Sequence, residues 1–329
     1  MPRLGLAGDV MLGRKVDERQ WDRPADGVWG DGVLDRLERL DGFLINLECC
    51  LSRRGTRWTR TYRPFHFRAD PDWAVPALHA ANVDACALAN NHLLDFGEPA
   101  LADTIDALDE AGIAHAGAGQ DLDRAFDPAV FAVGDLTAAV IAFTDNTPEY
   151  AAGEDSPGVA RLEFDVDDDR STALVSRAID RAAEADPDLL IASLHWGPNM
   201  VAEPASGYQR FARWLIEQGI DVIHGHSAHV FQGIEVLDGV PALYDTGDFV
   251  DDYAVDEELR NDRSFLFELE ITSQGAPSVL HLLPTEIADC RVRRASPEAA
   301  RWSRERMREL SEPFGTRFER VDDRLRCQL

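Results

Sequence analysis

The chain has 329 residues, 45% of them hydrophobic, and carries 33 basic and 60 acidic side chains for a net charge of −27 at pH 7. A chain of this length can bury a large core, because single cores stop growing near about 250 to 300 residues. Nucleic acid is excluded as an expected partner, since binding it requires clustered basic side chains that replace phosphate counterions.

The acidity is unusual in its composition. Lys15 is the only lysine, and aspartates crowd short segments such as residues 165–169. We interpret this as adaptation to high salt, where a Debye length of about 3 Å at 1 M removes most of the repulsion between surface carboxylates. An ordinary acidic protein is the alternative interpretation.

Cysteine usage and the first residues predict the compartment. The five cysteines are odd in number and lack Cys-x-x-Cys spacing, which is typical of reduced intracellular thiols. The N-terminus shows no leader features, and no run approaches the ~18 apolar residues that cross a bilayer. We therefore expect a cytoplasmic protein with no integral membrane segment, unless a leader has been removed.

Short apolar runs bounded by turn signals recur along the chain and predict buried strands. They cover residues 4–7, 43–47, 83–89, 138–143, 189–194, 220–223 and 240–244. Segments with helical periodicity lie between them, at residues 31–40, 71–81, 99–111, 171–185 and 208–218. This alternation predicts a layered α/β domain.

The pattern changes after residue 264. Two strand-like runs, 265–271 and 279–283, are joined by a Gly-Ala-Pro turn and predict a hairpin. Apolar residues at helical spacing after Ser296 predict a C-terminal amphipathic helix. Because we find no internal repeat or low-complexity linker, we expect one domain over residues 1–290 and a helical tail over residues 291–329.

Polar motifs follow the predicted strands, where α/β sheets gather ligand-binding groups. They are, in chain order, Gly8-Asp9-Val10-Met11-Leu12-Gly13-Arg14, Asn46-Leu47-Glu48, Asn90-Asn91-His92 with Asp95 and Gly97, His195-Trp196-Gly197, His224-Gly225-His226-Ser227-Ala228-His229, and Gly247-Asp248-Phe249. Carboxylate, amide and imidazole ligands suit Mn, Zn or Fe. Two such ions about 3.5 to 4 Å apart activate a water and stabilise both the attacking and the leaving oxygen, and a nearby histidine can protonate the leaving group.

The order of these motifs resembles the CapA-type capsule (poly-gamma-glutamate) synthesis proteins, a branch of the calcineurin-like metallophosphoesterase superfamily. The match runs from Gly8 to Phe249, about three quarters of the chain, and an ordered series is far more specific than one motif. The resemblance implies a four-layer α/β/β/α sandwich with two metal ions at one edge of the packed sheets. It also implies an anionic small-molecule or polymer substrate.

The resemblance further implies roles for individual residues. His92 would be the general acid, while Arg14 and Asp248 would lie beside the ligand set or face the phosphate, since a planar guanidinium suits an oxyanion. Glu48 would bridge the ions where the wider superfamily usually has Asp. The implied metal ligands are Asp9, Glu48, Asn91, His195, His226 and His229.

Two departures from the superfamily pattern affect the metal sites. Met11 stands where an imidazole is usual, which predicts a weak or empty first site. The histidines are spaced His-x-x-His rather than His-x-His, so which two of His224, His226 and His229 bind metal stays open.

Each motif alone also has an ordinary structural explanation. Asp9 could cap a helix or turn, Asn90 and Asn91 could form a tight turn, and His195 could be a hydrogen-bonded core histidine. Three histidines within residues 224–229 are hard to explain as core filling, so a metal role for at least two of them is the strongest site prediction.

Two further groups have two interpretations each. They are the segment Asp251-Asp252-Tyr253 and the arginines Arg53, Arg54, Arg57, Arg60 and Arg63, interleaved with Trp58 and Tyr62. The segment 251–253 could extend the pocket or be only surface, whereas the arginines of residues 53–63 could form a loop that meets an anionic substrate or a solvated loop paired with nearby acids.

The expected function is that of a metal-dependent hydrolase, in which a metal-activated water attacks a phosphoester or related anionic bond and His92 serves as the acid. One alternative is a non-hydrolytic or accessory protein in capsule polymer biosynthesis. Another is a degenerate member that binds a ligand without turnover, as Met11 suggests. The sequence does not identify the substrate, because fold alone does not specify function.

Overall fold

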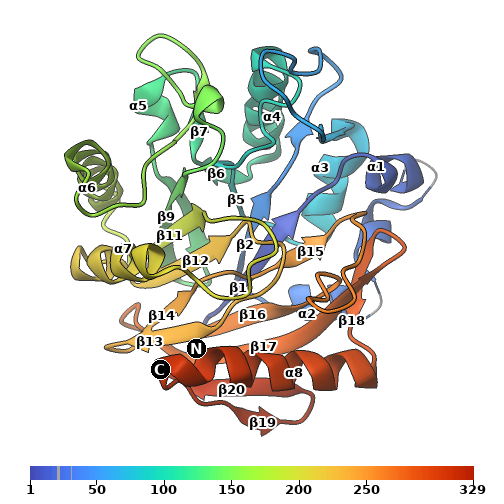
Figure 1. The fold of residues 1–329 in the computed structure, drawn as a ribbon, viewed down its shortest axis with the longest axis vertical. Coiled ribbons are helices and arrows are strands. Elements are labelled where there is room, and N and C mark those ends of the chain that lie inside the picture. Colours follow the sequence, from blue (N-terminus) through green and yellow to red (C-terminus); the bar gives the residue numbers. More distant parts are fainter. Residues whose placement is uncertain (21–22, 31) are drawn as a thin grey trace.

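The computed structural model describes residues 1–20, 23–30 and 32–329. Two β-sheets lie face to face at its centre (Figure 1). The larger sheet has the strand order β19 (Glu319–Val321), β20 (Arg324–Gln328), β17 (Pro277–Ala288), β16 (Arg263–Ile271), β1 (Arg3–Val10), β2 (Gly42–Leu47), β5 (Ala85–Ala87) and β6 (Ala114–Ala116). β15 (Asp248–Val250) pairs with β1, and β18 (Arg291–Arg294) pairs with β17.

The smaller sheet has six strands. Their order is β13 (Ile234–Leu237), β14 (Val240–Leu243), β12 (Val222–His226), β11 (Leu189–His195), β9 (Leu136–Thr144) and β8 (Ala129–Val133). β9, β11, β12 and β14 are parallel, whereas the outer strands β8 and β13 run antiparallel to their neighbours.

Neighbouring residues of one strand pack in different cores, because successive side chains of a strand point to opposite faces of the sheet. Leu44 of β2 packs in the core between the sheets, together with Val140 of β9 and Ile191 of β11. Phe43 and Ile45, on either side of Leu44, pack instead in the core beneath the helices of the larger sheet.

Helices cover the outer face of each sheet, which completes the predicted four-layer α/β/β/α sandwich. α1 (Lys15–Gln20), α2 (Leu34–Leu37), α3 (Pro71–Ala80) and α4 (Glu98–Ala111) cover the larger sheet. α5 (Leu122–Ala125), α6 (Asp169–Ala183) and α7 (Ser206–Glu217) cover the smaller one. Aspartate caps begin three of them, since the carboxylate of Asp70 accepts from Asp72 N in α3, that of Asp121 from Arg124 N in α5, and that of Asp168 from Ser171 N in α6.

The helix predicted at residues 31–40 is shorter than expected. Residue 31 lies outside the described residues, and α2 covers only Leu34–Leu37. Gly32 has φ +78°, a left-handed conformation that a right-handed helix does not include. The other predicted helices and strands are present, with boundaries shifted by a few residues.

The C-terminal segment contains the predicted helix, α8 (Pro297–Ser311), and also strands. β20 pairs with β17, and β19 pairs with β20. Met307 of α8 and Leu325 of β20 are fully buried in the core between the sheets. The segment is therefore not only helical, and a domain boundary at residue 290 stays a prediction.

The cysteines and helices bear on the predicted compartment. All five cysteines are free and buried. In the described part of the chain, none of the helices combines the length and apolarity that membrane crossing requires. The cytoplasmic location itself stays a prediction.

Candidate metal centre

The predicted motifs meet where strands of both sheets end. Asp9 lies near the end of β1, with Asn46 of β2 and Asp248 of β15 as its register partners on either side. In the smaller sheet, His195 and His226 are register partners at the ends of β11 and β12. Because the two sheets pack face to face, carboxylates of one sheet face imidazoles of the other.

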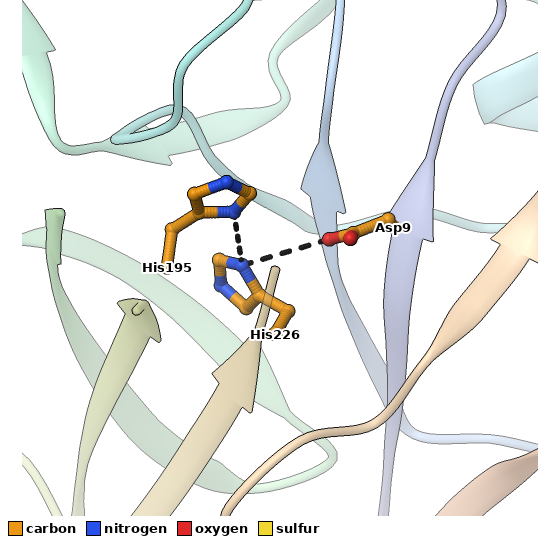
Figure 2. Close-up of side chains that lie close together, drawn as sticks. All are labelled: Asp9, His195 and His226. Atoms are coloured by element: carbon orange, nitrogen blue, oxygen red, sulfur yellow. Dashed lines mark hydrogen bonds and ion pairs between the residues drawn. The ribbon is translucent and has the colours of Figure 1, made fainter. Parts of the chain in front are cut away.

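One group of possible ligands consists of Asp9, His195 and His226, all buried. Figure 2 shows the Asp9 carboxylate directed toward the two imidazoles. His226 Nδ1 lies 2.9 Å from His195 Nδ1 and 3.6 Å from Asp9 Oδ1. One ligand atom from each residue lies within 4.8 Å of the others, close enough for a single ion to contact all three.

A second group shares Asp9 with the first and adds Glu48, His229 and Asp248. His229 Nδ1 lies 2.8 Å from Asp248 Oδ1 and 3.4 Å from Asp9 Oδ2. Glu48 Oε1 lies 3.9 Å from His195 Nε2, so Glu48 also faces the first group. The geometry makes Asp9 the carboxylate common to both groups, whereas the resemblance implied Glu48, and it adds Asp248 as a candidate ligand.

Four polar atoms of these groups, and one atom of Asn91, are buried without a hydrogen-bond partner. They are Asp9 Oδ2, Glu48 Oε1, Asn91 Oδ1, His195 Nε2 and Asp248 Oδ2. Burying such atoms is costly unless a hydrogen bond or a cation compensates them. A set of carboxylate, amide and imidazole donors fits Mn, Zn or Fe, so these residues fit the implied metal ions.

His224 has a different environment from His226 and His229. Its Nε2 lies 3.0 Å from the Ala7 carbonyl oxygen, and its Nδ1 lies 3.1 Å from Ser193 Oγ. Ser193 Oγ also lies 3.0 Å from His226 Nε2, which leaves His226 Nδ1 facing Asp9. Both nitrogens of His224 are thus engaged, and we assign it a supporting role that orients His226.

The loop after β12 holds His229 over the carboxylates. Ser227 and His229 have φ values of 113° and 61°, conformations that are uncommon for residues with a side chain. The Asp245 carboxylate accepts hydrogen bonds from Ala228 N and Gly247 N, each at 2.7 Å, and so ties this loop to the start of β15. The sequence analysis did not single out Asp245, although it directly follows the strand predicted at residues 240–244.

Asn90 and Asn91 have separate roles. Asn90 is buried, donates to the Leu47 carbonyl oxygen at 2.8 Å and accepts from His92 N at 3.0 Å. Asn90 is therefore a turn residue that supports the motif, in agreement with the structural alternative. Asn91 keeps its Oδ1 without a partner, as a ligand would.

His92 is buried and held by Asp95 and Phe67. Its Nδ1 is 2.6 Å from Asp95 Oδ2, and its ring stacks on Phe67 with a centroid distance of 3.8 Å. Asp95 in turn accepts from Phe67 N at 2.7 Å and from the Tyr150 hydroxyl at 3.0 Å. Asp95 therefore orients His92 and leaves its Nε2 available for proton transfer.

Arg14 is already paired within the protein. Its guanidinium binds the Asp252 carboxylate through two nitrogens. It also lies over the rings of Phe67 and Tyr253, at 4.9 and 5.4 Å. The Tyr253 hydroxyl donates to Glu48 Oε2 at 3.3 Å. The segment 251–253 thus extends the wall of the site, which supports the first of its two interpretations.

The arginine cluster at residues 53–63 divides between its two interpretations. Arg53 pairs with Asp70, and Arg54 pairs with Asp103, as expected of a solvated loop. Arg63 is mostly buried, with 14% of its side chain exposed. It donates to the Asn91 carbonyl oxygen and to Thr147 Oγ1. Arg63 is therefore the member of the cluster that contacts a candidate ligand residue.

Burial and crowding perturb the carboxylate pKa values in the site. Burial raises the pKa of Asp9, but His229, whose Nδ1 lies 3.4 Å from its carboxylate, and the charges of the other nearby histidines outweigh burial and leave the pKa below its ordinary value. Burial, with the charge of Asp9, raises the pKa of Glu48 well above its ordinary value. A bound cation would relieve this crowding of buried carboxylates.

The pKa values of the site's three imidazoles are shifted in different directions. Burial lowers the pKa of His195 to about 3, and burial together with His195 lowers the pKa of His226 far below its ordinary value. Burial also acts to lower the pKa of His229, but Asp248 and Glu48 outweigh it and raise the pKa well above the usual range. Neutral His195 and His226 are in the form that binds metal.

Met11 lies outside both ligand groups. Its side chain is fully buried in the core beneath the helices, and Gly13 N donates to its sulfur at 3.1 Å. The group of Asp9, His195 and His226 forms without it. A weak or empty first site therefore stays a prediction that metal analysis must test.

Residues 3–253 match the model of a family described as bacterial capsule synthesis protein PGA_cap. The chain belongs to this family. The matched region includes every candidate ligand, from Asp9 to Asp248. The predicted resemblance to capsule synthesis proteins is thus confirmed.

Relatives carry related descriptions. A "Probable polyglutamine synthesis accessory protein" of Mycobacterium tuberculosis is 35% identical over 97% of this chain and 94% of its own length. The capsule biosynthesis protein CapA of Bacillus anthracis is 27% identical over 87% of this chain and 67% of its own length. A solved structure, purple acid phosphatase PPD1 from yellow lupin, aligns with 89% of this chain and 52% of its own at 10% identity and a TM-score of 0.40. That likeness is too weak to support a conclusion about activity.

Proposed function

We propose that this chain is a metal-dependent hydrolase of a phosphoester or related anionic bond that acts in the synthesis of a glutamate-based capsule polymer. The observation that carries the proposal is the convergence of four buried polar atoms without hydrogen-bond partners, those of Asp9, Glu48, His195 and Asp248, on two ligand groups that share Asp9. The family and the names of its relatives connect this site with capsule polymer synthesis.

The residues that would hold metal are Asp9, His195 and His226 in one group and Asp9, Glu48, His229 and Asp248 in the other, with Asn91 beside them. When bound, two divalent ions would activate a water and stabilise the charge that develops on the oxygens of the reacting bond.

The chain's own residues supply the remaining functions. His92, held through Nδ1 by Asp95, presents Nε2 for proton transfer to a leaving group. Burial lowers the pKa of His92, although Asp95 opposes this shift. An anionic substrate beside the ring would favour its protonated form, so substrate binding would prepare His92 to act as an acid. Arg63 contacts Asn91, the residue before His92, and Arg14 lies over the Phe67 ring on which His92 stacks; both would help to orient an anion.

Metal analysis combined with hydrolysis assays tests the proposal. The purified protein is dialysed in high salt, its metal content is measured, and phosphomonoesters and phosphodiesters are assayed with added Mn. We expect about two ions per chain and Mn-dependent hydrolysis; the His229→Ala variant, which removes a ligand of the second group only, should lose one ion and the hydrolysis. His79→Ala, an exposed histidine on α3, is the matched control. A wild type that retains no transition metal and shows no Mn-dependent turnover would overturn the proposal.

An accessory role without hydrolysis is the second candidate. It is favoured by the description of the Mycobacterium relative as an accessory protein. Under this proposal the protein would bind metal and polymer, and no phosphoester or polymer bond would be cleaved in the assays above.

A further inference from the structure

Two adjoining cavities outside the candidate metal centre are lined mainly by arginine. Their volumes are about 220 and 410 Å³. Each is bordered by four arginines, and they share Leu283, Arg294 and Asp323, so together they contain seven arginines and two aspartates. We call the pair the arginine groove. In Figure 1 its elements α2, β17, β18, β20 and α8 lie in the lower part of the molecule.

The charge of the groove is opposite to that of the chain. Seven of the chain's 33 basic side chains line it, with only two carboxylates in its walls, although the whole chain carries −27. This concentration has a cost, because burial and the neighbouring Arg320 and Arg308 lower the pKa of Arg304. Like charges gathered on an acidic protein produce a strong local field that attracts anions.

Some of these arginines are paired within the protein and others are not. Arg36 binds the fully buried Glu268 through two nitrogens. Arg324 Nη1 is buried without a hydrogen-bond partner and lies 3.7 Å from the same glutamate. Arg39 and Arg301 are exposed, and neither has an ion-pair partner among the described residues. The groove therefore keeps free guanidinium donors at both of its ends.

We propose that the arginine groove binds a linear polycarboxylate, namely a poly-glutamate chain. The inference rests on the proposed role in capsule polymer synthesis and gives that polymer a location. A guanidinium fork matches a carboxylate through two parallel hydrogen bonds, and Arg36 makes this contact with the buried Glu268 behind the groove lining. Arg294 is paired with Asp323, so the forks open to successive side chains of one polymer are those of Arg39 in the first cavity and Arg301 in the second. No residue that lines the groove is a candidate metal ligand, so polymer can occupy it without displacing metal.

A binding titration tests this inference. Fluorescently labelled poly-glutamate is titrated with full-length protein and followed by anisotropy, in the lowest salt at which the circular dichroism of the protein is unchanged. Arg39→Ala combined with Arg301→Ala removes the two unpaired, exposed guanidiniums. We expect this double variant to bind about tenfold more weakly and with a smaller dependence on salt, as expected when ion pairs are lost. Arg170→Ala combined with Arg177→Ala makes the same charge change on α6 and should bind like wild type.

The outcomes separate this inference from the proposed function. Equal weakening in both double variants, or none in either, would overturn the groove as the binding site. Neutral polyglutamine that binds as tightly as poly-glutamate would overturn a site for carboxylates. Polyphosphate that competes more strongly than poly-glutamate would assign the groove to a phosphate polymer instead. In each case the metal content and the hydrolysis rate are measured separately. A wild-type protein that holds no metal and hydrolyses no substrate would refute the proposed function but not the binding of polymer in the groove.

Discussion

Replacing Asp9 by Asn tests the central feature of the site, a carboxylate shared by two ligand groups. The change keeps the shape of the side chain and removes its charge. Asp9 accepts from Asn46 Nδ2 at 2.7 Å and has its Oδ2 buried without a partner. The variant should therefore fold normally and lose the ligand that both ions need.

The size of the effect follows from the composition of the groups. The first group loses one of three ligands, and the second loses one of four. Removing even an outer partner of a metal ligand lowers affinity about 10- to 100-fold. For the shared ligand we expect a loss of at least about 100-fold in the first site, equivalent to about 2.7 kcal/mol. The variant should then retain at most one ion per chain.

Isothermal titration of chelated protein with Mn measures the number and affinity of the sites. Asp238→Asn, in the exposed turn between β13 and β14 where φ is +51°, is the matched control, because Asn tolerates this conformation. Glu48→Gln separates the two possible bridges. If Asp9→Asn binds two ions as tightly as wild type while Glu48→Gln loses both, Glu48 bridges and our reading of the geometry is wrong.

Three other predictions concern the acid, pH and salt. His92→Ala should lower kcat by about 10²- to 10⁴-fold with unchanged metal content, and a proportional loss of metal would show that His92 is a ligand. In chelated protein, burial is the main cause that raises the folded-state pKa of Asp251 to about 6 and that of Asp245 to about 8. The protonated carboxyl groups stabilise the folded state fully below pH about 4. This stabilisation is lost as pH rises through 6 to 8, and it amounts to roughly 3 kcal/mol for Asp251 alone. The melting temperature of chelated protein should therefore fall over this range, and more steeply than that of metal-loaded protein. For a chain of charge −27, the unfolding midpoint should rise from 0.1 to 2 M KCl as repulsion is screened, and no rise would contradict the high-salt interpretation.

The fold could be predicted wherever the hydrophobic pattern of a strand or helix can be recognised within its own residues. The buried strands β1, β2, β9 and β11 have continuous apolar runs, and α6 and α7 have clear helical periodicity, so the local sequence was sufficient. β8 has an alternating pattern of buried and exposed residues at the edge of the smaller sheet, and it was not predicted. β19 and β20 are short and charged, and they form because β20 pairs with β17. Such pairings depend on contacts that are distant in the chain.

The site was predictable as a set of residue types but not as a geometry. Ordered motifs identified Asp9, Glu48, His195, His226 and His229, which the structure brings together. The sequence could not show which histidine supports the others, because that depends on the Ala7 carbonyl oxygen and on Ser193, which belong to different strands. Asp245 was missed for the same reason. It acts through backbone amides of two loops, and no side-chain motif marks that role.

The two sheets contribute different chemistry to the centre. The larger sheet supplies the oxygen donors, since Asp9, Glu48 and Asp248 lie at or just after its strands, whereas His195, His226 and His229 come from the smaller sheet and the loop that follows it. A metal ion in either group would therefore join the two sheets across their interface, at a place where buried carboxylates otherwise repel one another. The same burial that makes these groups costly in the metal-free chain makes them a preorganised site for cations. A bound cation would give partners to the four buried polar atoms of Asp9, Glu48, His195 and Asp248 that lack a hydrogen bond.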